Sequence, residues 1–323
     1  MRRNLSQNNR WSFGFPLAGP GGERIDLWRT FRSHGVASLP PMFYDEGSRA
    51  FEITLPVAGS GPRTVRIEAG PPGTGLATVA GPPGRSNEAE NLSAAVRHVL
   101  RLEEDLSGFY ALASGDPELS WAARGAGRLV RSPTVFEEVV KTICTTNCSW
   151  SATERMVGAL VEHLGEPAPG APASGPRGRA FPTPQAMAGA GEEFYRDTVR
   201  AGYRARYLVS LSRSVAGGAL DLEVLGRASP EELPDGELER RLLELPGVGP
   251  YAAAHVMMML GRYSRLILDS WTRPKYARLA GKEAVPDAEI IGRFLGYGPY
   301  AGLAFWLYVT RDWAPEPALA PGT

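Results

Sequence analysis

A turn rich in glycine and proline, followed about twenty residues later by an aspartate, is the part of this sequence best suited to chemistry. Residues 246–250 (PGVGP) join two segments that both have helical patterns. Gly247 and Gly249 leave the backbone N–H groups of the turn open to an outside surface, and the helix that starts near Pro250 adds the positive end of its dipole. Such a turn can bind an anion, although the same residues also suit an ordinary connection between two helices.

The aspartate lies in LILDSWTR, residues 266–273. Two apolar residues, Ile267 and Leu268, place Asp269 at the expected start of the next helix. Its carboxylate can accept hydrogen bonds from the N–H groups of the first helical turn. As a cap alone it would be unremarkable, but close to an anion-binding turn it is a candidate for the catalytic carboxylate.

Basic residues are concentrated in two stretches of a chain whose net charge is zero. Residues 196–213 contain five arginines and one aspartate, and residues 262–282 contain six basic residues and one aspartate. A compact basic face on a neutral protein suits a locally bound polyanion. Taken alone, each stretch is more often the solvated face of a helix.

The composition excludes several classes of protein. The chain has two cysteines, Cys144 and Cys148, which are too few for a disulfide framework or for the four thiolates of a [4Fe–4S] cluster. We expect both to be reduced thiols and the protein to have no iron–sulfur cofactor. The chain has no apolar run near the ~18 residues of a membrane span and no signal peptide, so we expect a cytoplasmic protein.

The N-terminal part has the pattern of a small antiparallel sheet. Apolar residues alternate in 49–57 and 63–68, and a shorter run follows at 76–79. Glycine- and proline-rich stretches separate these runs, as expected for turns between strands.

The rest of the chain has mostly helical patterns, so the predicted class is α+β. Amphipathic runs lie at 91–102, 132–165 and 235–245, and the second opens with a capping signal, Ser132 before Pro133. We predict the following divisions: a flexible tail (1–24), a sheet domain (25–88), a helical domain (89–313) with a flexible insertion (166–180), and a second flexible tail (314–323).

The segment LPGVGPYAA…LILDSWTR resembles the helix-hairpin-helix and Gly/Pro–Asp signature of the HhH-GPD superfamily of DNA glycosylases. FEEVVKTICTTNCSW is similar to the superfamily's helix that ends at the DNA-wedging loop. AGYRARYL and GPYAGLAFWLY resemble segments of the 8-oxoguanine and bacterial 3-methyladenine II glycosylases, and the sheet with GFYALASGDPEL resembles the extra domain of these groups. The resemblance covers roughly residues 25–313 and implies that the helical part is an HhH-GPD domain.

The resemblance implies a role for each matching residue. Asp269 would be the catalytic aspartate, which stabilises the positive charge that develops on the sugar as the N-glycosidic bond breaks. The turn would bind the DNA backbone through Gly247, Val248 and Gly249. The superfamily often holds a monovalent cation, K⁺ or Na⁺, on nearby backbone carbonyls, here matched by Leu243, Leu245 and Val248.

Three further residues match positions that contact the base left without its partner. Asn147 would contact this orphan base, Tyr203 would be the wedge side chain, and Arg204 would make another contact. In relatives that also cut the strand, a lysine lies two positions after the second glycine of the hairpin. Here that residue is Tyr251, whose phenol cannot form a Schiff base.

The base pocket is expected to be aromatic. Phe305 occupies the position where the 8-oxoguanine enzymes have a base-reading glutamine, and a phenylalanine has no hydrogen-bonding group. A pocket of Phe305, Tyr300, Trp271 and Tyr251 would favour a cationic alkylated purine by about 0.5–2 kcal/mol over a neutral base.

These features predict a monofunctional DNA glycosylase of base excision repair. It would flip a damaged base, most simply an alkylated purine, out of double-stranded DNA and hydrolyse its N-glycosidic bond. We expect a monomer associated with the nucleoid, with no membrane partner and no cofactor other than the monovalent cation. The alternatives are an 8-oxoguanine-type glycosylase with lyase activity and a DNA-damage binding protein without catalysis.

Overall fold

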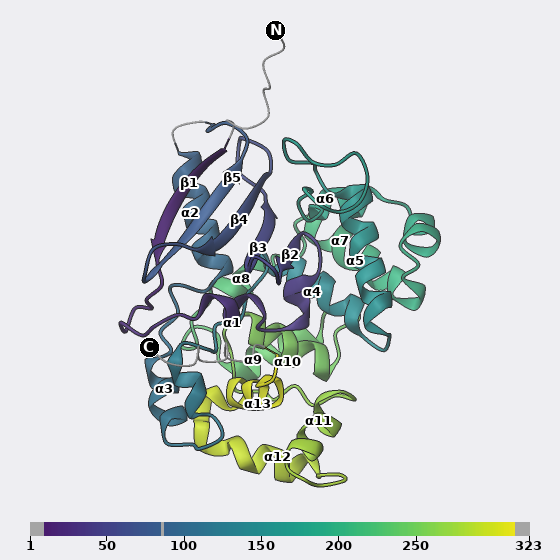
Figure 1. The fold of residues 1–323 in the computed structure, drawn as a ribbon. Helices are drawn as coiled ribbons and strands as arrows, with labels where there is room; N and C mark the ends of the chain where they lie inside the picture. Colours follow the sequence, from purple (N-terminus) through teal and green to yellow (C-terminus); the bar gives the residue numbers. More distant parts are fainter. Residues whose placement is uncertain (1–9, 85–86, 314–323) are drawn as a thin grey trace.

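The computed structural model describes residues 10–84 and 87–313, and the N-terminal part of this range is a five-stranded antiparallel sheet (Figure 1). The strand order is β1-β5-β4-β3-β2. Side chains that alternate along the inner strands, such as Ile53, Val65 and Val79, are fully buried. The strands are β1 (Arg10–Pro16), β2 (Met42–Asp45), β3 (Ala50–Leu55), β4 (Arg63–Ala69) and β5 (Thr74–Ala80). The predicted α+β class is confirmed.

Strand β1 corrects the prediction of a flexible tail over residues 1–24. It pairs with β5 along its whole length, from Arg10 opposite Ala80 to Pro16 opposite Thr74. Phe15 is buried against β5, where a Cβ on Gly75 would lie 2.4 Å from its ring. The tail prediction is therefore wrong from residue 10 onward. Residues 1–9 and the predicted tail 314–323 lie outside the described residues.

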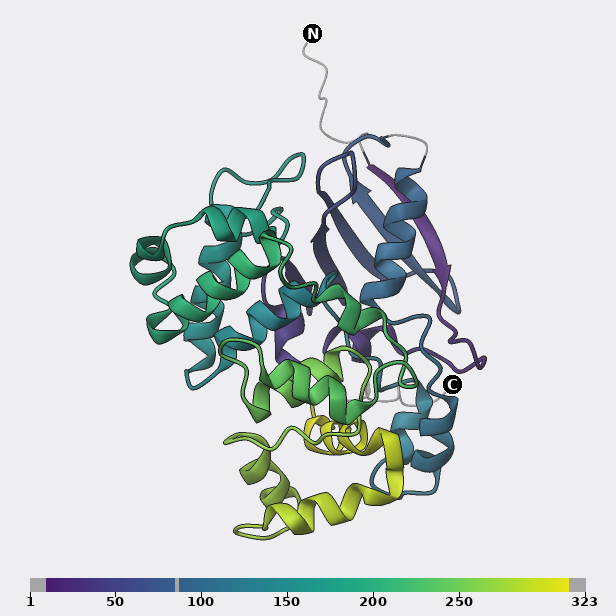
Figure 2. The ribbon, with the colours of Figure 1, turned by 180° about the vertical axis from the view of Figure 1, so that it is seen from behind.

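The helix α2 (Glu88–Val99) lies along one face of this sheet (Figure 2). Its residues Leu92, Val96 and Val99 are fully buried in the same core as the strand side chains. The division at residues 88 and 89 is therefore misplaced, because this helix completes the core of the sheet domain. A sheet with one apolar face needs such a covering element to be stable.

The remaining helices form two lobes that share α10. One core involves α4, α5, α7, α9 and α10, and the other involves α3 and α10 to α13. None of the described helices is long and apolar enough to cross a membrane. The elements are α1 (Leu27–Phe31), η1 (Gly35–Ser38), α3 (Ser107–Ser114), η2 (Ser120–Arg124), α4 (Val135–Thr145), α5 (Trp150–Leu164), α6 (Pro184–Gly189), η3 (Phe194–Thr198), η4 (Gly202–Arg204), α7 (Ala205–Ala216), α8 (Glu223–Arg227), α9 (Asp235–Leu243), α10 (Pro250–Met259), α11 (Thr272–Leu279), α12 (Asp287–Phe294), η5 (Leu295–Tyr300) and α13 (Ala301–Thr310).

The helical run predicted over 132–165 is two helices, α4 and α5. The first is capped by Thr134, whose hydroxyl accepts from the N–H of Glu137, rather than by Ser132. The chain leaves α4 at Thr146, turns at Asn147 in a left-handed conformation (φ 46°), and enters α5 after the Ser149 cap. The break creates an exposed loop between α4 and α5.

The predicted insertion over 166–180 contains no helix or strand beyond an isolated bridge between Pro167 and Arg179. The N–H of Ala168 donates to the carbonyl of Gly178 at 2.8 Å, which closes the loop at its base. The flexibility of this insertion stays a prediction.

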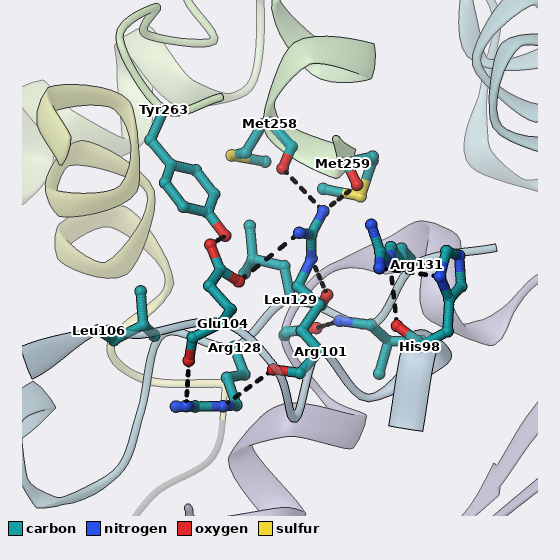
Figure 3. A network of polar contacts seen from close by, with 12 residues as sticks. His98, Arg101, Glu104, Leu106, Arg128, Leu129, Arg131, Met258, Met259 and Tyr263 are labelled. Atoms are coloured by element: carbon teal, nitrogen blue, oxygen red, sulfur yellow. Dashed lines mark hydrogen bonds and ion pairs between the residues drawn. The ribbon is translucent and has the colours of Figure 1, made fainter. Parts of the chain in front are cut away.

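A buried ionic cluster joins the sheet domain to the end of α10 (Figure 3). Arg101, just after α2, donates to the carbonyl oxygens of Met258 and Met259 at the C-terminal end of α10. The carboxylate of Glu104 lies 3.5 Å from this guanidinium and accepts from the hydroxyl of Tyr263 at 2.6 Å. A cation at the C-terminal end of a helix is favourable because unpaired carbonyls and the helix dipole make that end negative. The cluster therefore anchors α10 at the end opposite the hairpin.

Candidate functional site

A cavity of about 1520 Å³ opens where the hairpin, the α4–α5 loop, the start of α11 and the loop after α1 meet. It is large enough for a nucleotide-sized ligand. The residues that line it and enter the argument below are His34, Asn147, Trp150, Tyr203, Tyr207, Leu243, Leu245, Gly247, Val248, Gly249, Tyr251, His255, Asp269, Trp271, Trp306 and Trp313. The hairpin and the aspartate singled out from the sequence therefore share one cavity.

Asp269 lies in the turn that leads into α11 and accepts hydrogen bonds from backbone N–H groups at the start of that helix. Its Oδ1 accepts hydrogen bonds from the N–H groups of Trp271 at 2.8 Å and Thr272 at 2.6 Å. The hydroxyl of Thr272 accepts from the Asp269 N–H at 2.8 Å and donates to the carbonyl of Ile267 at 2.7 Å, which closes the turn. Oδ2 has no hydrogen-bond partner among the described residues, so one carboxylate oxygen is fixed and the other is available to the cavity.

The two glycines of the hairpin have different reasons to be glycine. Gly247 has a φ of +82°, and a Cβ there would lie 2.8 Å from the ring of Tyr207. Gly249 has an ordinary φ of −103°, and a Cβ there would meet nothing within 4 Å. Gly249 thus faces open space, as expected for a turn that approaches an outside surface. No side chain in the described ranges caps the N-terminus of α10, so the first amides of this helix are free for an anion.

Asn147 and Tyr203 come together at the rim of the cavity. The side-chain amide of Asn147 donates to the Tyr203 hydroxyl at 3.3 Å, and 48% of the Tyr203 residue surface is exposed. Arg204 does not line the cavity. It is buried, donates to the backbone carbonyl of Thr146, and has its guanidinium 4.6 Å from the centre of the Tyr203 ring. In this structure Arg204 braces the α4–α5 loop against Tyr203, and its predicted contact with the orphan base stays a prediction.

The aromatic pocket differs from the prediction at two of its four residues. Trp271 and Tyr251 line the cavity, but Tyr300 and Phe305 do not. Phe305 is fully buried against Phe294, with ring centres 5.5 Å apart, and Tyr300 packs on Phe109. Every residue of α13 is buried, so the sequence spacing could not show which face of this helix meets the cavity.

Two tryptophans that the sequence reasoning missed complete the aromatic wall. Trp306 and Trp313 line the cavity beside Trp271, and the three ring centres lie 5.4 to 6.0 Å apart. The Trp306 indole N–H donates to the carbonyl of Ser33 at 2.7 Å, which ties α13 to the loop after α1. The only available signal was the apolar, aromatic-rich composition of residues 301–313.

Two buried histidines in the cavity were also missed. His255 lies on α10 and His34 follows α1, and their ring centres are 6.3 Å apart. Burial lowers the pKa of His255 to about 4, an effect that the negative charge of Asp269 partly opposes. Burial also lowers the pKa of His34 to about 3, with the nearby His255 contributing. Both imidazoles are therefore neutral at neutral pH.

Tyr251 lies one helical turn before His255 and stays protonated. Burial raises the pKa of its phenol, and the charge of Asp269 adds to the effect. Its hydroxyl lies 3.3 Å from that of Thr145 on α4. The influence of Asp269 on both pKa values shows that the carboxylate, the phenol and the imidazole belong to one electrostatic environment.

The predicted basic face is much reduced in the structure. Five of the six basic residues in 262–282 form ion pairs with acids that lie outside that stretch, whereas Arg278 forms none within the described residues. The pairs are Arg262–Asp235, Arg265–Glu239, Arg273–Asp287, Lys275–Asp312 and Lys282–Glu289. This stretch is therefore a set of mostly paired side chains, of which Arg262 and Lys275 are buried, rather than the solvated helix face that the sequence also suggested. In 196–213, Arg206 stays exposed next to Tyr207 and has no acidic partner in the described part of the chain.

Comparison with known proteins adds the following. A 3-methyladenine DNA-glycosylase from Archaeoglobus fulgidus has a TM-score of 0.70 at 20% identity and covers 94% of this chain and 99% of its own. The second structure is an 8-oxoguanine glycosylase/lyase from Clostridium acetobutylicum in complex with double-stranded DNA that contains cytosine opposite 8-oxoG. It has a TM-score of 0.68 at 19% identity and covers 95% of this chain and 96% of its own. No family model matches the sequence.

A DNA-3-methyladenine glycosylase of Bacillus subtilis is 24% identical over 164 residues. The match covers 50% of this chain, and the chain spans about half the length (52%) of that curated relative. The two structures, which cover 94% and 95% of this chain, confirm the fold that the sequence resemblance implied, including the sheet domain.

Proposed function

From the glycosylase fold that this chain shares with these structures, we propose that it is a monofunctional DNA glycosylase of base excision repair. It hydrolyses the N-glycosidic bond of a damaged base, foremost an alkylated purine, and leaves an abasic site. One observation carries the proposal: Asp269, with one oxygen fixed and one free, shares a cavity with an uncapped helix-hairpin-helix turn.

The mechanism follows from this arrangement. The amides at the start of α10 bind a phosphate, and Tyr203 with Asn147 fills the gap as the target nucleotide rotates out, at a cost of a few kcal/mol. The free oxygen of Asp269 then faces the sugar as the bond to the base stretches and positive charge develops. A pair of unit charges at ~4 Å contributes roughly 4 kcal/mol at an effective dielectric constant of ~20, which is about a thousandfold in rate.

Hydrolysis without strand cleavage is supported by the composition of the cavity. Tyr251 occupies the position of the lyase lysine, and no lysine is among the described residues that line the cavity. A protonated phenol cannot attack the sugar to form an imine, so water has to be the nucleophile.

The aromatic wall supports alkylated purines as substrates. Trp271, Trp306 and Trp313 line the cavity, and aromatic ring faces attract a cationic base by about 0.5–2 kcal/mol. A base that already carries a positive charge also departs as a neutral molecule, so a single carboxylate is enough to assist it.

The partner in this proposal is double-stranded DNA with a damaged base, bound by a monomer at the nucleoid in the cytoplasm. A monovalent cation would suit the hairpin, because Leu243, Leu245 and Val248 all line the cavity and backbone carbonyl oxygens are ligands that K⁺ and Na⁺ accept. Bound there, it would add positive charge beside the DNA phosphates.

The test is a panel of duplexes that each contain one lesion, incubated with the enzyme with and without subsequent alkali. We expect strand cleavage at 7-methylguanine and 3-methyladenine only after alkali, and no adduct on borohydride treatment. Cleavage without alkali, together with a trapped adduct, would establish the alternative of an 8-oxoguanine-type glycosylase with lyase activity. Tight binding to lesions with no base release would establish a binding protein without catalysis.

A further inference from the structure

His255 is placed to act on the same ligand as Asp269. It lies on α10 one turn after Tyr251, with ring centres 6.2 Å apart, and it lines the cavity with 5% of its surface exposed. The charge of Asp269 acts on its imidazole. Tyr251 and His255 therefore line the same cavity that would hold a base with its sugar against Asp269.

The two ring nitrogens of His255 have different surroundings. Nδ1 lies 3.2 Å from the hydroxyl oxygen of Thr142, a fully buried residue on α4. Nε2 has no hydrogen-bond partner among the described residues. One nitrogen is thus held by the protein and the other is left for a group in the cavity.

The protonation of this imidazole follows from its neighbours. Burial keeps it neutral, and a neutral imidazole carries one N–H. If the Thr142 hydroxyl donates to Nδ1, the hydrogen lies on Nε2, and the nearby carboxylate of Asp269 favours that tautomer because it attracts an N–H directed at the cavity. A neutral histidine in this form is a hydrogen-bond donor whose proton need not leave.

We propose that His255 is a second catalytic residue, which donates a hydrogen bond from Nε2 to the departing base, and that uncharged damaged purines are therefore substrates as well. This inference rests on the proposed glycosylase function. As the bond between C1′ and the base nitrogen breaks, its electron pair stays on the base. Water adds to C1′ and gives a proton to Asp269, from which it returns to the base, so His255 ends the cycle unchanged.

The charge of the lesion determines how much this hydrogen bond matters. A 7-methylguanine cation leaves as a neutral base and needs little help. Hypoxanthine or 8-oxoguanine leaves as an anion, and a hydrogen bond to a charged group is stronger than one to a neutral group. Loss of the donor should therefore slow the release of neutral lesions selectively, by about 10- to 100-fold.

The experiment compares single-turnover release of 7-methylguanine with that of hypoxanthine and 8-oxoguanine. The variants are His255→Phe, which keeps an aromatic ring without a donor, and His255→Gln, which keeps an N–H. The control is His163→Phe on the exposed part of α5. Thermal melting of each variant establishes that it is folded.

We expect His255→Phe to slow both neutral lesions by about 10- to 100-fold and 7-methylguanine by less than about 3-fold. His255→Gln should release the neutral lesions faster than His255→Phe but more slowly than the wild type. His163→Phe should match the wild type on all lesions. The role of His255 would be overturned, while the glycosylase proposal stands, by any of three results. His255→Phe could slow the release of all lesions equally, or leave the release of neutral lesions unchanged. The third such result is a wild type that releases only cationic bases. A wild type that releases no base at all would instead overturn the proposed function.

Discussion

Gly247 and Gly249 lie two positions apart in the same turn, but only Gly247 is required by the fold itself. The positive φ of Gly247 and the contact with the ring of Tyr207 are properties of the folded protein. The open space at Gly249 matters only when something docks there. The same reasoning applies to Asp269, where Oδ1 maintains the fold of the turn and Oδ2 is left for the proposed ligand.

This difference gives a matched pair of variants. Gly247→Ala should lower the free energy of unfolding by about 1–3 kcal/mol, because alanine resists a positive φ and its Cβ would press on Tyr207. Gly249→Ala should cost about 1 kcal/mol or less, since its Cβ meets no neighbour, but it should weaken binding to damaged and undamaged duplex alike. Urea unfolding and fluorescence anisotropy measure the two effects. Equal stability of the two variants would contradict the structural role of Gly247.

Helix α10 is the element on which the site depends. Its first turn contributes Tyr251 and its middle contributes His255 to the cavity, and its small residues pack into both helical cores. Its C-terminal end is held by Arg101, which belongs to the segment that follows the sheet domain (Figure 3). The contact with Arg101 therefore ties the end of α10 to the segment that follows the sheet domain.

Arg101→Met tests this anchoring. The variant leaves two helix carbonyls and the buried carboxylate of Glu104 without their cationic partner, and we expect it to cost about 3–5 kcal/mol of stability. As a control, Arg240→Met removes an arginine whose pairs with Glu237 and Glu244 are exposed, and it should leave the urea midpoint nearly unchanged. If the two variants unfolded at the same urea concentration, the cluster would not be an anchor.

At the scale of the whole molecule, the charge is balanced in space as well as in sum. Most basic side chains of the 262–282 stretch are paired, so contacts with DNA phosphates have to come mainly from helix amides and a few free arginines such as Arg206. The DNA affinity of a protein that neutralises few phosphates depends only weakly on the salt concentration.

Arg206→Gln should therefore reduce the slope of log Kd against log salt concentration by about 1. Arg227→Gln changes the net charge equally but removes an arginine that is paired with Asp221 on another part of the surface, and its slope should match the wild type. Binding isotherms at several salt concentrations measure both. A wild-type slope for Arg206→Gln would exclude this residue from the interface.

The parts of the site that could be predicted from the sequence have local signals. A turn that needs glycine and an aspartate that caps the next helix are encoded within a few residues, which is why the 246–250 turn and Asp269 were recognisable. The resemblance to the superfamily placed Asn147 and Tyr203 correctly at the cavity. Strand β1 was missed although Trp11, Phe13 and Phe15 alternate along it, a signal that could have identified it.

The parts that could not be predicted depend on tertiary contacts. His34 and Trp313 come from opposite ends of the chain and meet in the cavity only because the fold brings them there. The uniformly apolar helix α13 does not reveal that Trp306 faces the cavity and Phe305 the core. The acids that neutralise the second basic stretch lie elsewhere in the sequence, so local charge counting overestimated the basic face.

Single-turnover release of 7-methylguanine by wild type and by Asp269→Asn tests the central claim most directly. The amide keeps an oxygen that can accept from the N–H groups of Trp271 and Thr272, so the fold and DNA affinity should be retained. The rate of base release should fall about a thousandfold or more, because the neutral side chain no longer stabilises the sugar cation. Release at the wild-type rate by a folded, DNA-binding variant would contradict the account.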